Sequence, residues 1–311
     1  MHPTAMVRLL ALAALAGAPA LHAQCAPPDE DQPKVRDSLL VSTAWLAQHL
    51  HDGNLVILHV DHMSQDYSRG HIPGARRVDA MTYSSGDFDM LSPSALDSMM
   101  RDLGIGDASR VVIYGDPWVT GWVFAIMDLL GHGDRTALLD GGLGAWRAEG
   151  RPVSTESPRV TRAGPSAAHR REPVVDAAWV RAHLADEHVA VLDVRTPDEY
   201  AGRGTSHMSN GGHVTGAHAF DWSRIFVHSN EAINGGDTHL LPAADLRAML
   251  REAGVHPGIV PVTYCTVGMR ASQMYFVLRY LGYDPKFYDG SFNDWTRRGY
   301  PTTTGTARGS P

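Results

Sequence analysis

The sequence has few cysteines, no excess of positive charge and no apolar run long enough to span a bilayer. With only Cys25 and Cys265, it has no C-x-x-C pair to support a metal site, although it contains 17 histidines. A formal net charge of −7 disfavours nucleic acid and anionic membranes as partners. A small anionic substrate stays open, because local charge in a site can oppose the overall field.

The N-terminus predicts a secretory signal peptide over residues 1–23. Arg8 supplies the basic start and Leu9–Ala16 the short apolar core. We expect cleavage after Ala23, and Ala18–Ala20 offers another site. The polar, proline-rich segment 24–37 that follows is expected to be a flexible tail. The sequence therefore predicts an exported protein with no membrane span; a periplasm is the expected location, with a place beyond the cell left open.

Several segments of the chain occur twice in the same order. Repetition at this scale predicts two copies of one domain, over 38–154 and 173–303. A linker over 155–172 joins them, and a frayed C-terminal tail follows over 304–311. The matching segments are Val41–Leu50 with Val175–Leu184, Leu55–Val60 with Val189–Val194, Gly70–Ala75 with Gly212–Ala217, Leu96–Tyr114 with Leu246–Tyr264, and Asp140–Gly142 with Asp289–Ser291.

Short apolar strands alternate with amphipathic helices in each copy. This pattern predicts an α/β fold in which a mostly parallel sheet is flanked by helices. Ser42 and Asp176 stand at equivalent positions where capping residues open a helix. Ligands of such sheets bind outside the carboxyl ends of the strands, so residues that directly follow a strand are candidates for the site.

Cys265 lies where a buried strand, Pro261–Tyr264, turns toward a helix expected over Ala271–Leu281. The free N–H groups and the positive dipole end of a helix N-terminus favour an anion. Such a position favours the reactive thiolate, and Arg270 would add to the effect. An isolated cysteine is commonly an inert buried side chain, and export permits a disulfide. We expect Cys265 to be a free nucleophile, with a reversible bond to Cys25 left open.

The first copy carries Gly115 where the second carries Cys265. It therefore lacks a nucleophile, and it also lacks a counterpart of Arg270. We expect the first copy to be inactive, to cover the second domain and to shape one wall of a pocket at the seam between the two.

These motifs resemble those of the tandem rhodanese sulfurtransferases over about 38–303. In that family the second copy carries the cysteine that forms a persulfide, which agrees with Gly115 in the first copy here. The segments that carry the resemblance are Gly70–Ala75, Asp193–Arg195 with Glu199–Gly202, Cys265–Arg270, and Tyr288–Ser291 with Trp295.

The resemblance implies transfer of a sulfane sulfur from a small anionic donor, thiosulfate or 3-mercaptopyruvate, to a thiol or cyanide acceptor. The Cys265 thiolate would take the outer sulfur of the donor as a persulfide, whose charge the loop amides stabilise. This chemistry needs no metal and no organic cofactor. The loop residues implied to bind substrate and persulfide are Thr266, Val267, Gly268, Met269 and Arg270.

Two departures from the family concern the donor. Glu199 takes the place where some animal members have a basic residue that holds the donor anion, so we expect Arg270 to supply that charge. The loop lacks the serine-bearing C-G-S-G pattern of mercaptopyruvate users, which favours thiosulfate.

Three further residues are candidates for the pocket: Arg195, His62 and Trp222. His62 takes a place where the family can have a tryptophan, and Trp222 follows the second Gly-His segment. For both, packing or surface exposure is an equally good interpretation. Structural roles within the motifs are expected for Asp193, His213 and Asp289.

Two other functions compete with an enzyme that transfers sulfur. A cysteine phosphatase also uses a thiolate at a helix N-terminus, but it needs a longer loop than the four residues between Cys265 and Arg270. A non-enzymatic persulfide carrier or partner-binding module would share the same fold. Saturable release of sulfite from thiosulfate distinguishes the enzyme from the carrier.

Overall fold

The structure is a computed structural model that describes residues 32–62, 66–86, 88–164, 171–203, 211–234 and 236–311. The predicted signal peptide and Cys25 lie outside the described residues. None of the described helices is long and apolar enough to cross a bilayer.

Residues from Pro33 onward form two sheets of five strands with the same topology. Every neighbouring pair within these two sheets is parallel, as expected. The first sheet has the order β1 (Leu40–Val41), β5 (Thr136–Leu139), β4 (Arg110–Gly115), β2 (Leu55–Asp61) and β3 (Arg76–Asp79). The second has the order β6 (Val174–Val175), β11 (Lys286–Tyr288), β10 (Val260–Tyr264), β7 (Val189–Asp193) and β9 (His218–Ala219). The prediction of a duplicated α/β fold is confirmed.

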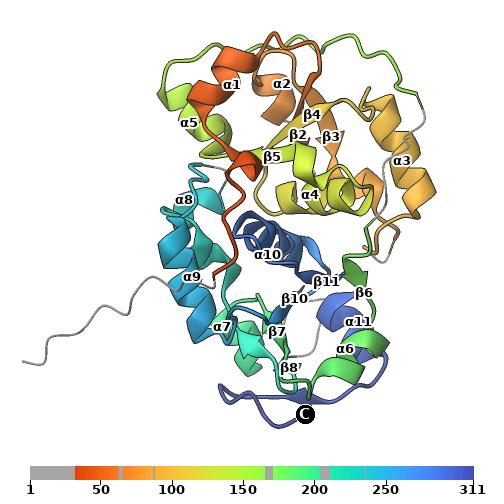
Figure 1. The fold of residues 1–311 in the computed structure, drawn as a ribbon, viewed down its shortest axis with the longest axis vertical. Coiled ribbons are helices and arrows are strands. Elements are labelled where there is room, and N and C mark those ends of the chain that lie inside the picture. Colours follow the sequence, from red (N-terminus) through yellow and green to blue (C-terminus); the bar gives the residue numbers. More distant parts are fainter. Residues whose placement is uncertain (1–31, 63–65, 87, 165–170, 204–210, 235) are drawn as a thin grey trace, which may run out of the picture. The chain divides into compact units, whose positions relative to one another are not determined.

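Helices flank both sheets (Figure 1). The expected caps form, because the side chains of Ser42 and Asp176 accept from the backbone N–H groups of Trp45 and Trp179. In the first copy the helices are α1 (Thr43–His49), α2 (Asp66–Arg69), α3 (Pro93–Asp102), α4 (Thr120–Leu129) and α5 (Gly142–Ala148). In the second they are α6 (Ala177–His183), α7 (Pro197–Ala201), α8 (Ser229–Ala232), α9 (Ala243–Glu252), α10 (Met269–Tyr280) and α11 (Ser291–Arg297).

Helices α4 and α10 pack against each other between the two sheets (Figure 1). Residues Thr120–Asp128 of α4 are all buried, as expected of a helix enclosed on every side. A Cβ added to Gly121 would lie only 2.4 Å from Cα of Gln273, so a glycine is needed where the two backbones meet. The two copies therefore share one continuous core.

The two ends of the described chain differ from expectation. Pro33–Asp37, predicted as part of a flexible tail, packs on the second copy: Arg36 N–H donates to the Tyr280 carbonyl at 2.7 Å. The C-terminal tail, predicted to fray, is also held, because Gly216 N–H donates to the Arg308 carbonyl at 2.7 Å and Arg308 donates back to the Gly216 carbonyl. Composition alone could not reveal these partners, which lie far away in the sequence. Just before the C-terminal tail, β12 (Thr302–Thr303) pairs antiparallel with β8 (His213–Val214).

Candidate active site

Cys265 directly follows β10 at the carboxyl edge of the second sheet, and α10 begins at Met269. The backbone N–H of Gly268 donates to Sγ of Cys265 at 3.2 Å. Gly268 has a φ of +92°, a conformation in which a side chain would be strained. This turn brings an amide to the sulfur, and Cys265 itself is only 1% exposed.

The first residues of α11 form hydrogen bonds with the backbone of the loop that follows β10. Ser291 Oγ accepts from the N–H of Cys265 at 3.1 Å, and Phe292 N–H donates to the Cys265 carbonyl at 3.0 Å. Asn293 N–H donates to the carbonyl of Thr266 at 3.1 Å. Ser291 and Phe292 therefore hold both the N–H and the carbonyl of Cys265. The spacing of the motifs in the sequence does not reveal this arrangement.

Arg270 is paired with Glu199 of α7 rather than left free for a donor. Its guanidinium donates to both carboxylate oxygens, at 2.7 and 2.9 Å, and to Thr266 Oγ1 at 2.7 Å. Burial alone would raise the pKa of Glu199, but the hydrogen bonds and charge of Arg270, with help from Thr196, lower it to about 2. The carboxylate is therefore ionised at neutral pH, and the charge of Arg270 is largely balanced.

Arg195 lies inside the second domain. It is 2% exposed and donates to Asp193 at 2.9 and 2.6 Å and to the Gly212 carbonyl at 2.6 Å. Asp193 also accepts from the hydroxyl of Tyr264 at 2.6 Å. His213 stacks on Tyr200, whose carbonyl is 2.9 Å from Nδ1. These contacts connect β7, β8 and β10 and give Asp193, Arg195 and His213 structural positions.

Gly115 occupies the counterpart of Cys265 and has no room for a side chain. A Cβ there would lie 2.0 Å from the carbonyl oxygen of Val60, and φ is +133°. The first copy therefore differs from the second in its backbone at this point, as well as in lacking a thiol.

His62 lies at the corresponding edge of the first sheet. Its Nδ1 is 2.6 Å from Asp116, and both residues line a cavity of about 550 Å³ with Trp118 and Arg147. Ile233, Asn234 and Thr238 of the second copy line the same cavity, so this candidate pocket residue faces a cavity that both copies form.

Trp118 is a site residue that the sequence analysis missed. Its ring lies 5.8 Å from the guanidinium of Arg270 and 5.0 Å from the ring of Trp222, which is itself 2% exposed. Trp118 comes from the degenerate loop of the first copy, at the position equivalent to Gly268. Aligning the two loops residue by residue would have singled it out. Through this ring the first copy contacts the loop that follows Cys265.

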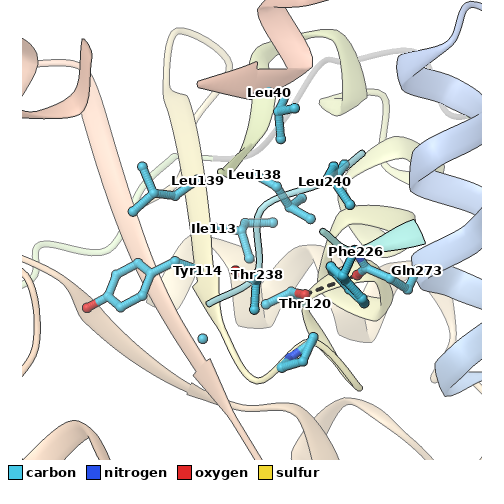
Figure 2. Close-up of a pocket in the computed structure, with 12 residues that line it drawn as sticks. Leu40, Ile113, Tyr114, Thr120, Leu138, Leu139, Phe226, Thr238, Leu240 and Gln273 are labelled. Atoms are coloured by element: carbon cyan, nitrogen blue, oxygen red, sulfur yellow. Dashed lines mark hydrogen bonds between the residues drawn. The ribbon is translucent and has the colours of Figure 1, made fainter. Parts of the chain in front are cut away.

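The seam between the copies is closely packed near α4 and α10. Figure 2 shows Thr120 donating to Gln273 across the seam, at 3.1 Å, beside a cavity lined by both copies. That cavity holds about 20 Å³, room for about one water molecule and not for a sulfur donor. Among the described residues, no group of three or more His, Cys, Asp or Glu side chains could hold a metal ion.

The fold and this site define a duplicated α/β protein with one thiol-bearing loop. The Rhodanese-like domain profile matches residues 42–149 and 176–298. The chain therefore belongs to the rhodanese family, and its fold as a tandem of two such domains is confirmed.

Relatives of known name cover most of the chain. The sulfur carrier protein TtuD of Thermus thermophilus is 34% identical over 83% of this chain and 93% of its own length. A putative thiosulfate sulfurtransferase of Saccharopolyspora erythraea is 32% identical over 84% and 94%. The thiosulfate sulfurtransferase of Corynebacterium glutamicum is 32% identical over 82% and 87%. These relatives confirm the expected class, an enzyme of the sulfurtransferase type.

Two solved structures share the fold at lower identity. The crystal structure of YnjE has a TM-score of 0.78 and 24% identity, covering 87% of this chain and 69% of its own. The anaerobic ergothioneine biosynthesis enzyme of Chlorobium limicola, solved with trimethyl histidine, has a TM-score of 0.77 and 21% identity, covering 88% and 71%.

Proposed function

We propose that this protein moves a sulfane sulfur from thiosulfate, or a related donor such as 3-mercaptopyruvate, to cyanide or a thiol through a persulfide on Cys265. The observation that carries the proposal is the hydrogen bond from Gly268 N–H to Sγ. A backbone amide that points at the sulfur stabilises negative charge there before and after transfer.

The chemistry proceeds in two displacements. The Cys265 thiolate attacks the outer sulfur of thiosulfate; the S–S bond of the donor breaks, and sulfite leaves with its electron pair. A thiol or cyanide acceptor then attacks the outer sulfur of the persulfide and releases the Cys265 thiolate. Both steps conserve charge and electrons without a metal or an organic cofactor.

A carrier role is the second candidate, supported by the similarity to a protein named a sulfur carrier. A carrier would hold the persulfide until a partner protein removes it, without rapid turnover on small acceptors. A phosphatase is less well supported, because Arg270 is held by Glu199 and Thr266 instead of being available to bind an oxyanion.

Export to a periplasm is part of the proposal and rests on the signal-like segment 1–23. N-terminal sequencing of the protein recovered outside the cytoplasm should show a chain that begins at Gln24. A full-length chain retained in the cytoplasm would contradict export.

Intact-mass measurement after exposure to thiosulfate tests the sulfur chemistry. The wild type should gain one sulfur atom, which cyanide removes. Cys265→Ala should gain none, and Cys25→Ala should behave like the wild type. An unmodified wild type would contradict the thiosulfate assignment.

A turnover assay distinguishes the enzyme from the carrier. Sulfite release that saturates with thiosulfate identifies the enzyme, whereas a single stoichiometric release with no turnover on cyanide or thiols identifies the carrier.

A further inference from the structure

Asp289 connects the first domain to the second at the level of the catalytic loop. Its Oδ2 accepts a hydrogen bond of 2.7 Å from the backbone N–H of Met90, although the two residues are 199 positions apart. Its Oδ1 has no hydrogen-bond partner among the described residues, and the side chain is only 8% exposed. Burial raises the pKa of Asp289 to about 7, against the effect of the Met90 N–H. Such a group is costly to bury, which calls for an explanation.

The second oxygen of Asp289 lies against the turn that contacts the sulfur. A Cβ built on Gly268 would be 3.1 Å from Asp289 Oδ1, 2.9 Å from the Asp289 carbonyl oxygen and 2.8 Å from the ring of Trp122. Gly268 is the residue whose N–H donates to Cys265 Sγ. Asp289 therefore lies between Met90 of the first domain, from which it accepts, and the Gly268 turn, whose amide donates to the thiol sulfur.

Other backbone groups, and not the N–H of Met90, form the hydrogen bonds within the turn that carries Met90. Leu91 N–H donates to the Tyr83 carbonyl, and Ser85 N–H donates to the Asp89 carbonyl. The N–H of Met90 is directed instead to Asp289 of the second domain. The bond between them is thus a contact between domains and not part of the local turn.

The duplication supplies an internal comparison. Asp140 stands at the equivalent motif position of the first copy, and its Oδ1 accepts from the N–H of Leu240, in the second copy, at 3.0 Å. The same bond between the domains is therefore made twice, in opposite directions. Only the bond of Asp289 borders a loop with a thiol, because the first copy has Gly115 in that place.

We propose that Asp289 is a positioning residue for sulfur transfer, which ties the Gly268 turn to Met90 and so keeps the Gly268 amide directed at Cys265 Sγ. This inference rests on the proposed function. The amide stabilises the charge on sulfur as the persulfide forms, so a displaced amide lowers the rate of sulfur uptake more than the binding of a donor.

The test compares Asp289→Ala with its matched control Asp140→Ala in the full-length chain. Each variant loses one hydrogen bond between the domains, and thermal melting measures the effect of that loss on the fold. We expect Asp289→Ala to lower kcat for sulfite release from thiosulfate about tenfold, with KM changed by less than about twofold. Asp140→Ala should keep kcat within about twofold of the wild type. Asp289→Asn retains an oxygen acceptor for Met90 and should recover most of the lost kcat.

A second sulfur source separates this inference from the choice of donor. Loading of Cys265 by inorganic polysulfide, followed by mass spectrometry, should be slowed in Asp289→Ala by the same factor as sulfite release. A wild type that polysulfide loads and thiosulfate does not would overturn thiosulfate as donor and leave the role of Asp289 to be decided by the loading rates. Equal loading rates in Asp289→Ala and Asp140→Ala would overturn that role. So would a fall in Asp289→Asn as large as in Asp289→Ala.

Met90→Pro and Leu240→Pro form a second matched pair should Asp289→Ala fail to fold. Each removes one backbone donor and leaves both aspartates in place. A loss of kcat confined to Met90→Pro supports the inference, and equal losses contradict it.

Discussion

Arg270 and Glu199 form a two-point ion pair beside the catalytic loop, with N–O distances of 2.7 and 2.9 Å. The hydroxyl of Thr266 hydrogen-bonds to both partners: it donates to Glu199 and accepts from Arg270. The positive charge of Arg270, which we expected to hold the donor, is therefore balanced by Glu199 within the protein. A thiosulfate dianion would meet backbone amides with only weak help from this guanidinium.

Replacing Glu199 with Gln should strengthen thiosulfate binding, because it releases the positive charge of Arg270. We expect KM for thiosulfate to fall about threefold to tenfold at low ionic strength, and the gain to shrink with added salt. Steady-state sulfite release at two salt concentrations measures the effect. Glu187→Gln, an exposed substitution in the loop before β7, is the control. An unchanged or higher KM in Glu199→Gln would show that Arg270 does not reach the donor.

The same substitution should lower the melting temperature. Breaking a largely buried ion pair by removing one partner leaves the other charge uncompensated, at a cost of about 3 kcal/mol. Glu199→Gln should therefore melt several degrees below both the wild type and Glu187→Gln. Equal melting temperatures would mean that solvent already screens the pair.

His59 makes stability depend on pH on the acid side of neutrality. Burial lowers the pKa of His59 to about 4, from 6.5, so between these values the unfolded chain binds a proton that the folded chain does not. Stability therefore falls as the pH drops from 7 to 5, by about 2 kcal/mol from this residue. Denaturant unfolding at both pH values should show a smaller fall in His59→Gln than in the wild type. An exposed histidine variant, His51→Gln, should keep the wild-type difference.

The fold could be predicted from the sequence because each copy repeats the same alternation of buried strands and amphipathic helices. Cys265 stood out because one copy has it and the other has Gly115. The partners of the loop could not be predicted in this way. Glu199 reaches Arg270 across 71 positions, and Asp289 accepts from Met90 across 199 positions; no local periodicity encodes either contact.

Trp118 illustrates a different reason for a missed residue. The first copy was expected to form a wall of the site, but which side chain does so depends on how α4 and α10 pack. That packing is set by a close approach of Gly121 to Gln273, a relationship between two backbones. Arg195 was a candidate for the pocket, and the structure places it in the interior, where it is paired with Asp193.

Trp118→Ala should make the catalytic loop more accessible. Removing the ring uncovers Arg270 and Trp222, so iodoacetamide should alkylate Cys265 several-fold faster than in the wild type. Peptide mapping by mass spectrometry follows the modification at Cys265 specifically. The control is Trp45→Ala, which removes a ring that stacks on His49 within α1. It should leave the rate of alkylation at Cys265 unchanged. An unchanged rate in Trp118→Ala would place the access route elsewhere.

Gly115→Ala should destabilise the first domain strongly. A Cβ at this position would lie 2.0 Å from the Val60 carbonyl oxygen, so β2 and β4 must move apart, and the positive φ adds strain. We expect a loss of about 3 kcal/mol or more in the free energy of unfolding, measured by denaturant titration. Gly53→Ala is the matched control, because a Cβ there meets nothing within 4 Å. Grafting a thiol through Gly115→Cys meets the same overlap and should not create a persulfide site in the first copy. Sulfur loading at residue 115 of that variant would show that the overlap at Gly115 does not exclude a working thiol there.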